Sequence, residues 1–148
     1  MDLFVGGARY GRYFVGTDMA EMATVLIVED EDQVRVLAES YLREQGHQTV
    51  SAATAEEALA VFEVVERIDV LFTDIHLRGD THSGLDVAKQ ARERQPDLAV
   101  LYATGQAVTD GIRAMMVENS AVLEKPYTVE QLQTSLSVHF RIKPRSRG

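Results

Sequence analysis

The chain has 148 residues, of which 45% are hydrophobic and 26% are charged, with a formal net charge of −8 and no cysteine. This length is sufficient for one domain with one sizeable core. The lack of cysteine excludes disulfides, thiolate zinc sites and cysteine nucleophiles. No apolar run approaches the roughly 20 residues that a membrane span needs, and the N-terminus lacks the pattern of a signal peptide. We therefore expect a cytoplasmic protein.

The negative charge is unevenly distributed along the chain. Residues 1–22 carry a net charge of −1, residues 141–148 carry +4, and the body between them therefore carries −11. An acidic body argues against nucleic-acid binding, which usually needs a basic face. We interpret the basic tail, residues 141–148, as a solvated end.

Residues 1–22 mix glycine and aromatic residues without a clear period. One interpretation is a disordered extension, or an upstream start codon with Met19 or Met22 as the true start. The alternative is an arm whose aromatic side chains dock on the domain or on a partner. The folded domain is expected to occupy residues 23–140.

From residue 23 onward, short apolar runs alternate with segments of helical periodicity. Strands are predicted at 25–28, 49–52, 69–73, 99–103 and 121–124, and helices at 31–45, 54–65, 84–94, 108–118 and 128–140. The four-residue segments that begin at Thr54 and Thr128 match capping boxes. This alternation predicts an α/β fold, a flavodoxin-like doubly wound five-stranded parallel sheet of order 2-1-3-4-5 with five helices.

Charged residues follow three of the predicted strands. The first strand runs into Glu29 and Asp30, the third into Asp74, and the fifth into Lys125. Parallel strands bring their carboxyl ends to one edge of the sheet, where open α/β folds bind ligands. Three ionised carboxylates need compensating cations, and beyond the charge of Lys125 the deficit matches a hard divalent cation such as Mg²⁺. Asp74 could then attack phosphorus, with Thr104, at the end of the fourth strand, as a hydroxyl donor.

Each of these groups also has a structural explanation when taken alone. The acidic pair or Asp74 could cap a helix start, and Lys125 could be a solvated loop lysine. Their joint occurrence at the ends of successive strands favours a functional site over these explanations.

The segments that carry these groups resemble the receiver domain of bacterial response regulators over about residues 23–140. The matching segments are Val25-Leu26-Ile27-Val28-Glu29-Asp30, Phe72-Thr73-Asp74, Ser83-Gly84-Leu85, Ala103-Thr104-Gly105 and Glu124-Lys125-Pro126-Tyr127. The resemblance implies that Asp74 is the phosphoacceptor for the phosphohistidine of a histidine kinase. It also implies that Thr104 and Lys125 bind the phosphoryl oxygens and that the Lys125–Pro126 peptide bond is cis.

The same resemblance implies the ligands of the Mg²⁺ ion. Asp30 and Asp74 would bind it directly and Glu29 would assist, with the backbone carbonyl of His76 as a further ligand. His76 and Gln106 occupy the two positions that tune the loss of the phosphoryl group in this family.

Two features of the predicted loops and strands depart from the family pattern. The stretch from Asp74 to Gly84 is two residues longer than usual and has Arg78 in place of a proline, which predicts a more mobile loop. Val122 stands where the family often has an aromatic residue that turns inward on activation. One alternative is that Tyr102 or Tyr127, both nearby, substitutes for this aromatic residue, but we favour core packing for both.

The four histidines show no metal-ligand spacing. We therefore expect surface roles for all of them, with His76 near enough to the predicted site to overhang it. They are His47, His76, His82 and His139.

These features predict a stand-alone receiver, because only eight residues follow Phe140 and these are too few for an output domain. It would be a regulatory phosphoacceptor that signals to a downstream protein target. The contact surface would be formed by 108–118, 121–124 and 128–140, where Met115, Met116 and Val117 supply adaptable apolar side chains and where a homodimer could also form.

Two alternatives to this function remain. One is a phosphorelay intermediate or phosphate sink that exchanges the phosphoryl group with a histidine phosphotransfer protein. The other is a Mg²⁺-dependent phosphatase with an aspartyl intermediate, for which the sequence indicates no substrate pocket.

Overall fold

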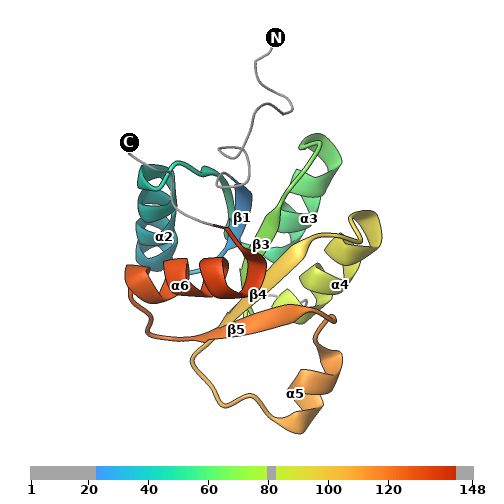
Figure 1. Cartoon of the computed structure of the whole chain (residues 1–148). Coiled ribbons are helices and arrows are strands. Elements are labelled where there is room, and N and C mark those ends of the chain that lie inside the picture. Colours follow the sequence, from blue (N-terminus) through green and yellow to red (C-terminus); the bar gives the residue numbers. More distant parts are fainter. Residues whose placement is uncertain (1–22, 80–82, 143–148) are drawn as a thin grey trace.

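The computed structural model describes residues 23–79 and 83–142, in which five strands alternate with five helices. In chain order they are β1 Thr24–Val28, α2 Asp32–Glu44, β2 Gln48–Ala52, α3 Ala55–Val64, β3 Val70–Asp74, α4 Gly84–Arg94, β4 Ala99–Thr104, α5 Asp110–Met115, β5 Ser120–Glu124 and α6 Val129–Phe140. The strands are parallel and lie in the order β2-β1-β3-β4-β5, which confirms the predicted fold (Figure 1). The predictions for residues 1–22, for His82 and for the tail beyond 142 lie outside the described residues.

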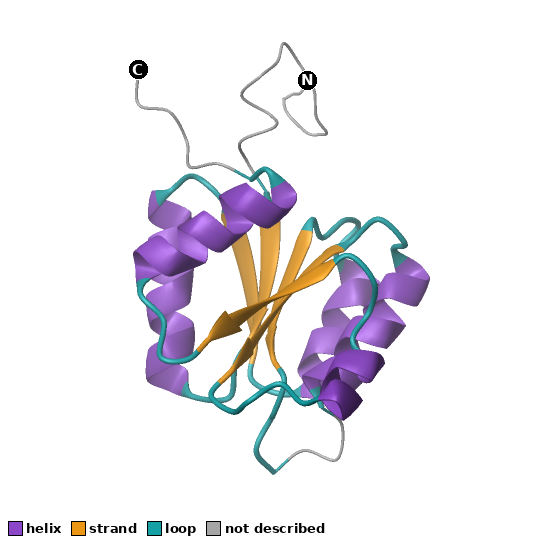
Figure 2. Cartoon of the chain, turned by 60° about the horizontal axis from the view of Figure 1, so that its bottom comes forward, coloured by secondary structure: helices purple, strands orange, loops and turns teal. Residues whose placement is uncertain are grey.

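Helices cover both faces of the sheet, so the central strands are buried on both sides. Helices α2 and α6 pack on one face and α3, α4 and α5 on the other (Figure 2). Successive residues of a strand point to opposite faces. Leu26 and Leu71 therefore join the core under α3 and α4, whereas Ile27 and Phe72 join the core under α2 and α6. Among the described residues, no helix is long and apolar enough to cross a membrane.

Helix α5 is much shorter than the predicted helix 108–118. It covers Asp110–Met115, begins at the cap residue Thr109 and ends where Met116 adopts an extended conformation. The backbone N–H of Val117 then donates to the Tyr102 hydroxyl, at 3.1 Å, instead of to a carbonyl one helical turn back. A tertiary hydrogen bond thus replaces the last turn of the predicted helix.

The two predicted capping boxes differ in the structure. The box from Thr128 to Gln131 is complete at the start of α6. At α3, the Thr54 side chain accepts from the Glu57 N–H as predicted, but Glu57 accepts from the N–H of Ala53, one residue before the cap. The prediction of a reciprocal box at Thr54 was therefore wrong.

Both ends of the described chain are held on the core under α2 and α6. Ala23 donates its N–H to Nδ1 of His47, at 3.2 Å, and His47 is only 4% exposed, so the expected surface role of this histidine was wrong. Ile142 is also buried there, and its carbonyl accepts from Gln133 and Ser137. Since α6 runs back along the sheet from the end of β5, both ends lie at the edge where the strands begin.

Candidate functional site

The register of the sheet brings the predicted site residues to one edge. Val28 of β1 lies beside Thr73 of β3, so Glu29 and Asp74, the next residue in each segment, emerge at the same level. Asp74 lies beside Ala103 of β4, and Thr104 lies beside Glu124 of β5. The amide N–H of Lys125 donates to the Thr104 carbonyl at 2.8 Å, which fixes the start of the loop after β5.

Three carboxylates and one ammonium group meet at this edge. Carboxylate oxygens of Glu29, Asp30 and Asp74 lie within 4.8 Å of one another. The Lys125 Nζ lies 2.9 Å from Glu29 Oε1 and 3.2 Å from each carboxylate oxygen of Asp74. Glu29 and Asp74 are 4% and 6% exposed, so two buried acids share one cation.

This crowding changes the protonation behaviour of the site. Burial and the nearby charge of Glu29 raise the pKa of Asp74 to about 7, although Lys125 opposes the shift. Burial by itself lowers the pKa of Lys125, but its hydrogen bond to Glu29 and the two carboxylate charges hold that pKa above its usual value. The site therefore has an excess of negative charge that one lysine does not remove.

The donor set fits a hard divalent cation. All three candidate ligands are carboxylate oxygens, which Mg²⁺ prefers, and no other group of three or more metal-ligating side chains occurs in residues 23–79 and 83–142. A dication at this point would compensate the charge that Lys125 leaves. The predicted ligands Glu29, Asp30 and Asp74 are thus brought together, and the His76 carbonyl remains a predicted ligand.

No side-chain hydrogen bond to this cluster is seen for the described side chains of Thr104 and His76. Thr104 is buried, and its hydroxyl donates to the Gln106 carbonyl and accepts from the Gln106 N–H. The side chain of His76 is exposed. The Lys125–Pro126 peptide bond is cis, as predicted.

Gly84 holds the start of α4 directly against the backbone of Asp74. Its N–H donates to the Ile75 carbonyl at 2.9 Å. A Cβ at this position would lie 1.8 Å from the Asp74 carbonyl oxygen. Sequence reasoning noted Gly84 as part of a motif but gave no reason for it, and the reason is this close approach. Ser83 and Asp86 form a full capping box at the same helix start.

Arg78 contacts Asp30, which sequence reasoning did not predict. Its backbone N–H donates to Asp30 Oδ2 at 2.7 Å, and its Nε lies 3.4 Å from the same oxygen. Partial burial raises the pKa of Asp30, but these contacts and the arginine charge hold it below its usual value. The residues are 48 apart in sequence, so no local pattern indicates the pair.

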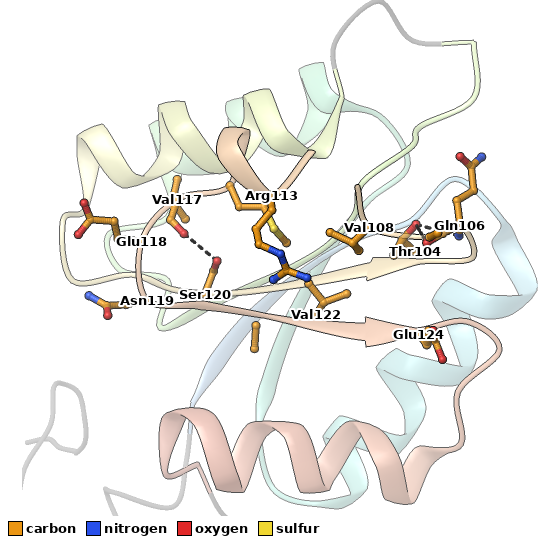
Figure 3. Close-up of a pocket in the computed structure, with 13 residues that line it drawn as sticks. Thr104, Gln106, Val108, Arg113, Val117, Glu118, Asn119, Ser120, Val122 and Glu124 are labelled. Atoms are coloured by element: carbon orange, nitrogen blue, oxygen red, sulfur yellow. Dashed lines mark hydrogen bonds between the residues drawn. The ribbon is translucent and has the colours of Figure 1, made fainter. Parts of the chain in front are cut away.

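An open groove of about 870 Å³ lies beside the site, between the loop after β4, α5 and β5. Figure 3 shows Thr104 and Gln106 at one end, and Val117 and Ser120, joined by a hydrogen bond of 2.7 Å, at the other. Arg113 extends from α5 across the groove toward Val122 on β5 (Figure 3). Val122, which stands where the family often has an aromatic residue, therefore lines an open groove.

Of the two nearby aromatic residues, Tyr102 packs in the core as predicted, and Tyr127 is partly buried and packs against it. Tyr102 is fully buried under α3 and α4. Tyr127 makes an edge contact with Phe72, with ring centroids 5.7 Å apart. Of the predicted contact residues, Met115 is 45% exposed, whereas Met116 and Val117 pack partly against the core.

Comparison with known proteins gives consistent matches. The family model of the response regulator receiver domain matches residues 25–137. The chain is 30% identical over 122 residues to the sensor kinase CckA of Brucella abortus (strain 2308), a match that covers 81% of this chain and 13% of that protein. The chain spans about half or less of the length of the curated relatives it matches.

Two solved structures illustrate the likeness of fold. The response regulator receiver protein from Sinorhizobium medicae WSM419 has a TM-score of 0.73 at 30% identity, with 82% of this chain and 96% of that chain covered. The chemotaxis response regulator CheY4 of Vibrio cholerae has a TM-score of 0.71 at 25% identity, with 80% and 99% covered.

Proposed function

Because the chain belongs to the response regulator receiver domain family, we propose that it accepts a phosphoryl group on Asp74 from the phosphohistidine of a histidine kinase, in the cytoplasm. The observation that carries this proposal is the pairing of both Asp74 carboxylate oxygens with Lys125 beside two further carboxylates. It supports a phosphoacceptor whose charge is balanced from two sides, by an ammonium group and by a divalent cation.

The chemistry follows from the arrangement of these side chains. A carboxylate oxygen of Asp74 attacks phosphorus, a P–O bond forms, and the P–N bond of the phosphohistidine breaks as the imidazole leaves. Asp30 and Asp74 would hold Mg²⁺ with help from Glu29 and the His76 carbonyl, and the ion when bound would neutralise phosphoryl oxygens. Lys125 already lies within hydrogen-bond distance of the attacking carboxylate and would keep this contact with the phosphoryl group.

The output of this reaction would be a change of surface. Phosphorylation replaces the single negative charge of the Asp74 carboxylate with the nearly two negative charges of a phosphoryl group. The Thr104 hydroxyl, now bonded to Gln106, would turn to a phosphoryl oxygen and draw the loop before α5 with it. We expect a downstream protein, or a second copy of the chain, to recognise the surface of α5, β5 and α6. The domain would thus regulate others and would not turn over a substrate.

A second candidate function is a relay that passes the phosphoryl group to or from a histidine phosphotransfer protein. The observation that favours it is the 30% identity to part of a sensor kinase. A receiver that serves a kinase in this way needs no signalling surface of its own, and it shares the same Asp74 chemistry.

Phosphoryl incorporation tests the shared chemistry. The full chain is incubated with acetyl phosphate and Mg²⁺, and wild type is compared with Asp74→Asn and with Asp97→Asn, a matched change near the opposite edge of the sheet. We expect an acid-stable, base-labile adduct on wild type and Asp97→Asn only. If neither acetyl phosphate nor a phosphorylated histidine kinase labels wild type while Mg²⁺ is bound, the proposal is wrong.

Transfer from labelled protein separates the two candidate functions. The phosphorylated chain is mixed with a histidine phosphotransfer protein, and the label on each protein is followed over time. Rapid movement of the label to the histidine would favour the relay, whereas retention together with a new partner contact would favour the switch.

A further inference from the structure

Arg78 places a second cation on the acidic site, in addition to Lys125. Lys125 contacts Glu29 and Asp74, whereas Arg78 contacts Asp30 through both its backbone N–H and its side chain. The Arg78 guanidinium also lies 3.8 Å from Glu31. The three carboxylates of the cluster are therefore divided between two basic residues.

The two basic residues are held very differently. Lys125 is 21% exposed and is fixed by two carboxylates at 2.9 and 3.2 Å. The Arg78 side chain is 76% exposed, and its contact with Asp30 is the longer one at 3.4 Å, while the Asp30 side chain is only 17% exposed. The guanidinium can therefore swing into solvent at little cost, whereas Asp30 stays in place.

We propose that Arg78 is a tethered counter-cation of the metal site, whose guanidinium neutralises Asp30 until Mg²⁺ displaces it. This inference rests on the proposed function, because it takes the cluster of Glu29, Asp30 and Asp74 as the Mg²⁺ site. A dication and a guanidinium repel each other and compete for the same carboxylate. Arg78 therefore weakens Mg²⁺ binding without being a ligand, and it acts as a positioning residue through Asp30.

The Arg78 guanidinium can move away from Asp30 while the backbone of Arg78 still holds the Asp30 carboxylate. The stronger contact, at 2.7 Å, comes from the backbone N–H of Arg78. A substitution that changes only the side chain keeps this hydrogen bond. The effect of the charge can therefore be separated from the effect of the loop on Asp30.

Calorimetric titration of the full, unphosphorylated chain with Mg²⁺ tests the inference. Four proteins are compared: wild type, Arg78→Gln, Arg78→Lys and Arg67→Gln. Arg67→Gln is the matched control, because Arg67 forms exposed ion pairs with Asp69 and Asp97 near the opposite edge of the sheet. Circular dichroism verifies that each variant is folded.

We expect Arg78→Gln to bind Mg²⁺ about threefold to fivefold more tightly than wild type, which is the scale of one exposed ion pair. Arg78→Lys and Arg67→Gln should bind as wild type does. The difference in Mg²⁺ affinity between wild type and Arg78→Gln should become smaller as the salt concentration rises from about 0.02 M to about 0.5 M, because salt screens exposed charges. A purely structural role of Arg78 would not give this dependence on salt.

The inference is overturned if Arg78→Gln binds Mg²⁺ as weakly as wild type or more weakly. It is also overturned if Arg78→Lys binds as tightly as Arg78→Gln, because charge would then not be the cause. If wild type shows Mg²⁺-dependent labelling of Asp74 in these cases, only this inference fails. If no variant binds Mg²⁺ and Asp74 takes no label, the proposed function fails with it.

Discussion

Replacing Gly84 with alanine should make the domain easier to unfold, because the added Cβ would push the start of α4 away from the end of β3. The added Cβ would lie 1.8 Å from the Asp74 carbonyl oxygen and 2.9 Å from Thr73 Oγ1. Ordinary contact begins near 3.4 Å, so the helix start and the strand end would have to separate by about 1.6 Å. The hydrogen bond from the Gly84 N–H to the Ile75 carbonyl resists this separation.

Two opposing effects set the magnitude. Alanine is better than glycine in a helix by up to about 1 kcal/mol, which favours the variant. Forcing a carbon atom into packed structure costs about 1–3 kcal/mol or more. Because the first atom met is a backbone carbonyl in a buried strand, it cannot rotate away, and the cost should be at the high end. We expect Gly84→Ala to lower the free energy of unfolding by at least about 2 kcal/mol.

Urea unfolding followed by circular dichroism measures this loss, and Gly111→Ala is its control. Gly111 lies in α5, where an added Cβ meets nothing closer than the Thr109 hydroxyl at 3.8 Å. Gly111→Ala should therefore raise the free energy of unfolding by about 0.5–1 kcal/mol. The steric argument is refuted if Gly84→Ala is as stable as wild type while Gly111→Ala is stabilised.

Three other changes test separate parts of the structure. His47 is buried and burial lowers its pKa below 6.5 in the folded state, so its contribution to stability is complete above that pH and is lost as the pH falls. Between pH 7.5 and 5.5, wild type should therefore lose more stability in urea unfolding than His47→Gln does, and equal losses would contradict this. Tyr102→Phe leaves the Val117 N–H without its acceptor and should lower the free energy of unfolding by about 1–2 kcal/mol. Hydrogen exchange at the Val117 amide should become faster, and unchanged exchange there would contradict the prediction. Thr128→Ala removes the cap of α6 and should cost about 1 kcal/mol in the same assay, so a loss below the error of the measurement would argue against the cap.

The parts of this fold that were predictable are those that local pattern determines. Buried parallel strands give continuous apolar runs, and charged residues at their ends mark the edge where the site forms. This is how Glu29, Asp74 and Lys125 were identified together. The order of strands followed from the alternation of strands and helices, since right-handed crossovers leave few arrangements.

The parts that were missed depend on contacts between distant segments. Helix α5 ends early because the Val117 N–H donates to the Tyr102 hydroxyl. His47 is buried where its Nδ1 accepts from the N–H of Ala23, just before β1. The contact of Arg78 with Asp30 depends on the path of a loop. In each case the partner lies 15 or more residues away, beyond the reach of helical or strand periodicity.

The position of Ala23 and Ile142 has a practical consequence for handling and for evolution. Both residues are anchored at the edge where the strands begin, and the acidic site lies at the edge where they end. Any group joined at either residue would therefore lie on the side of the molecule away from Asp74. Such a group could be a fluorophore, a surface linker or a second folded unit. The domain can therefore be joined to longer polypeptides, or attached to a sensor chip, while its acidic site stays accessible to solvent.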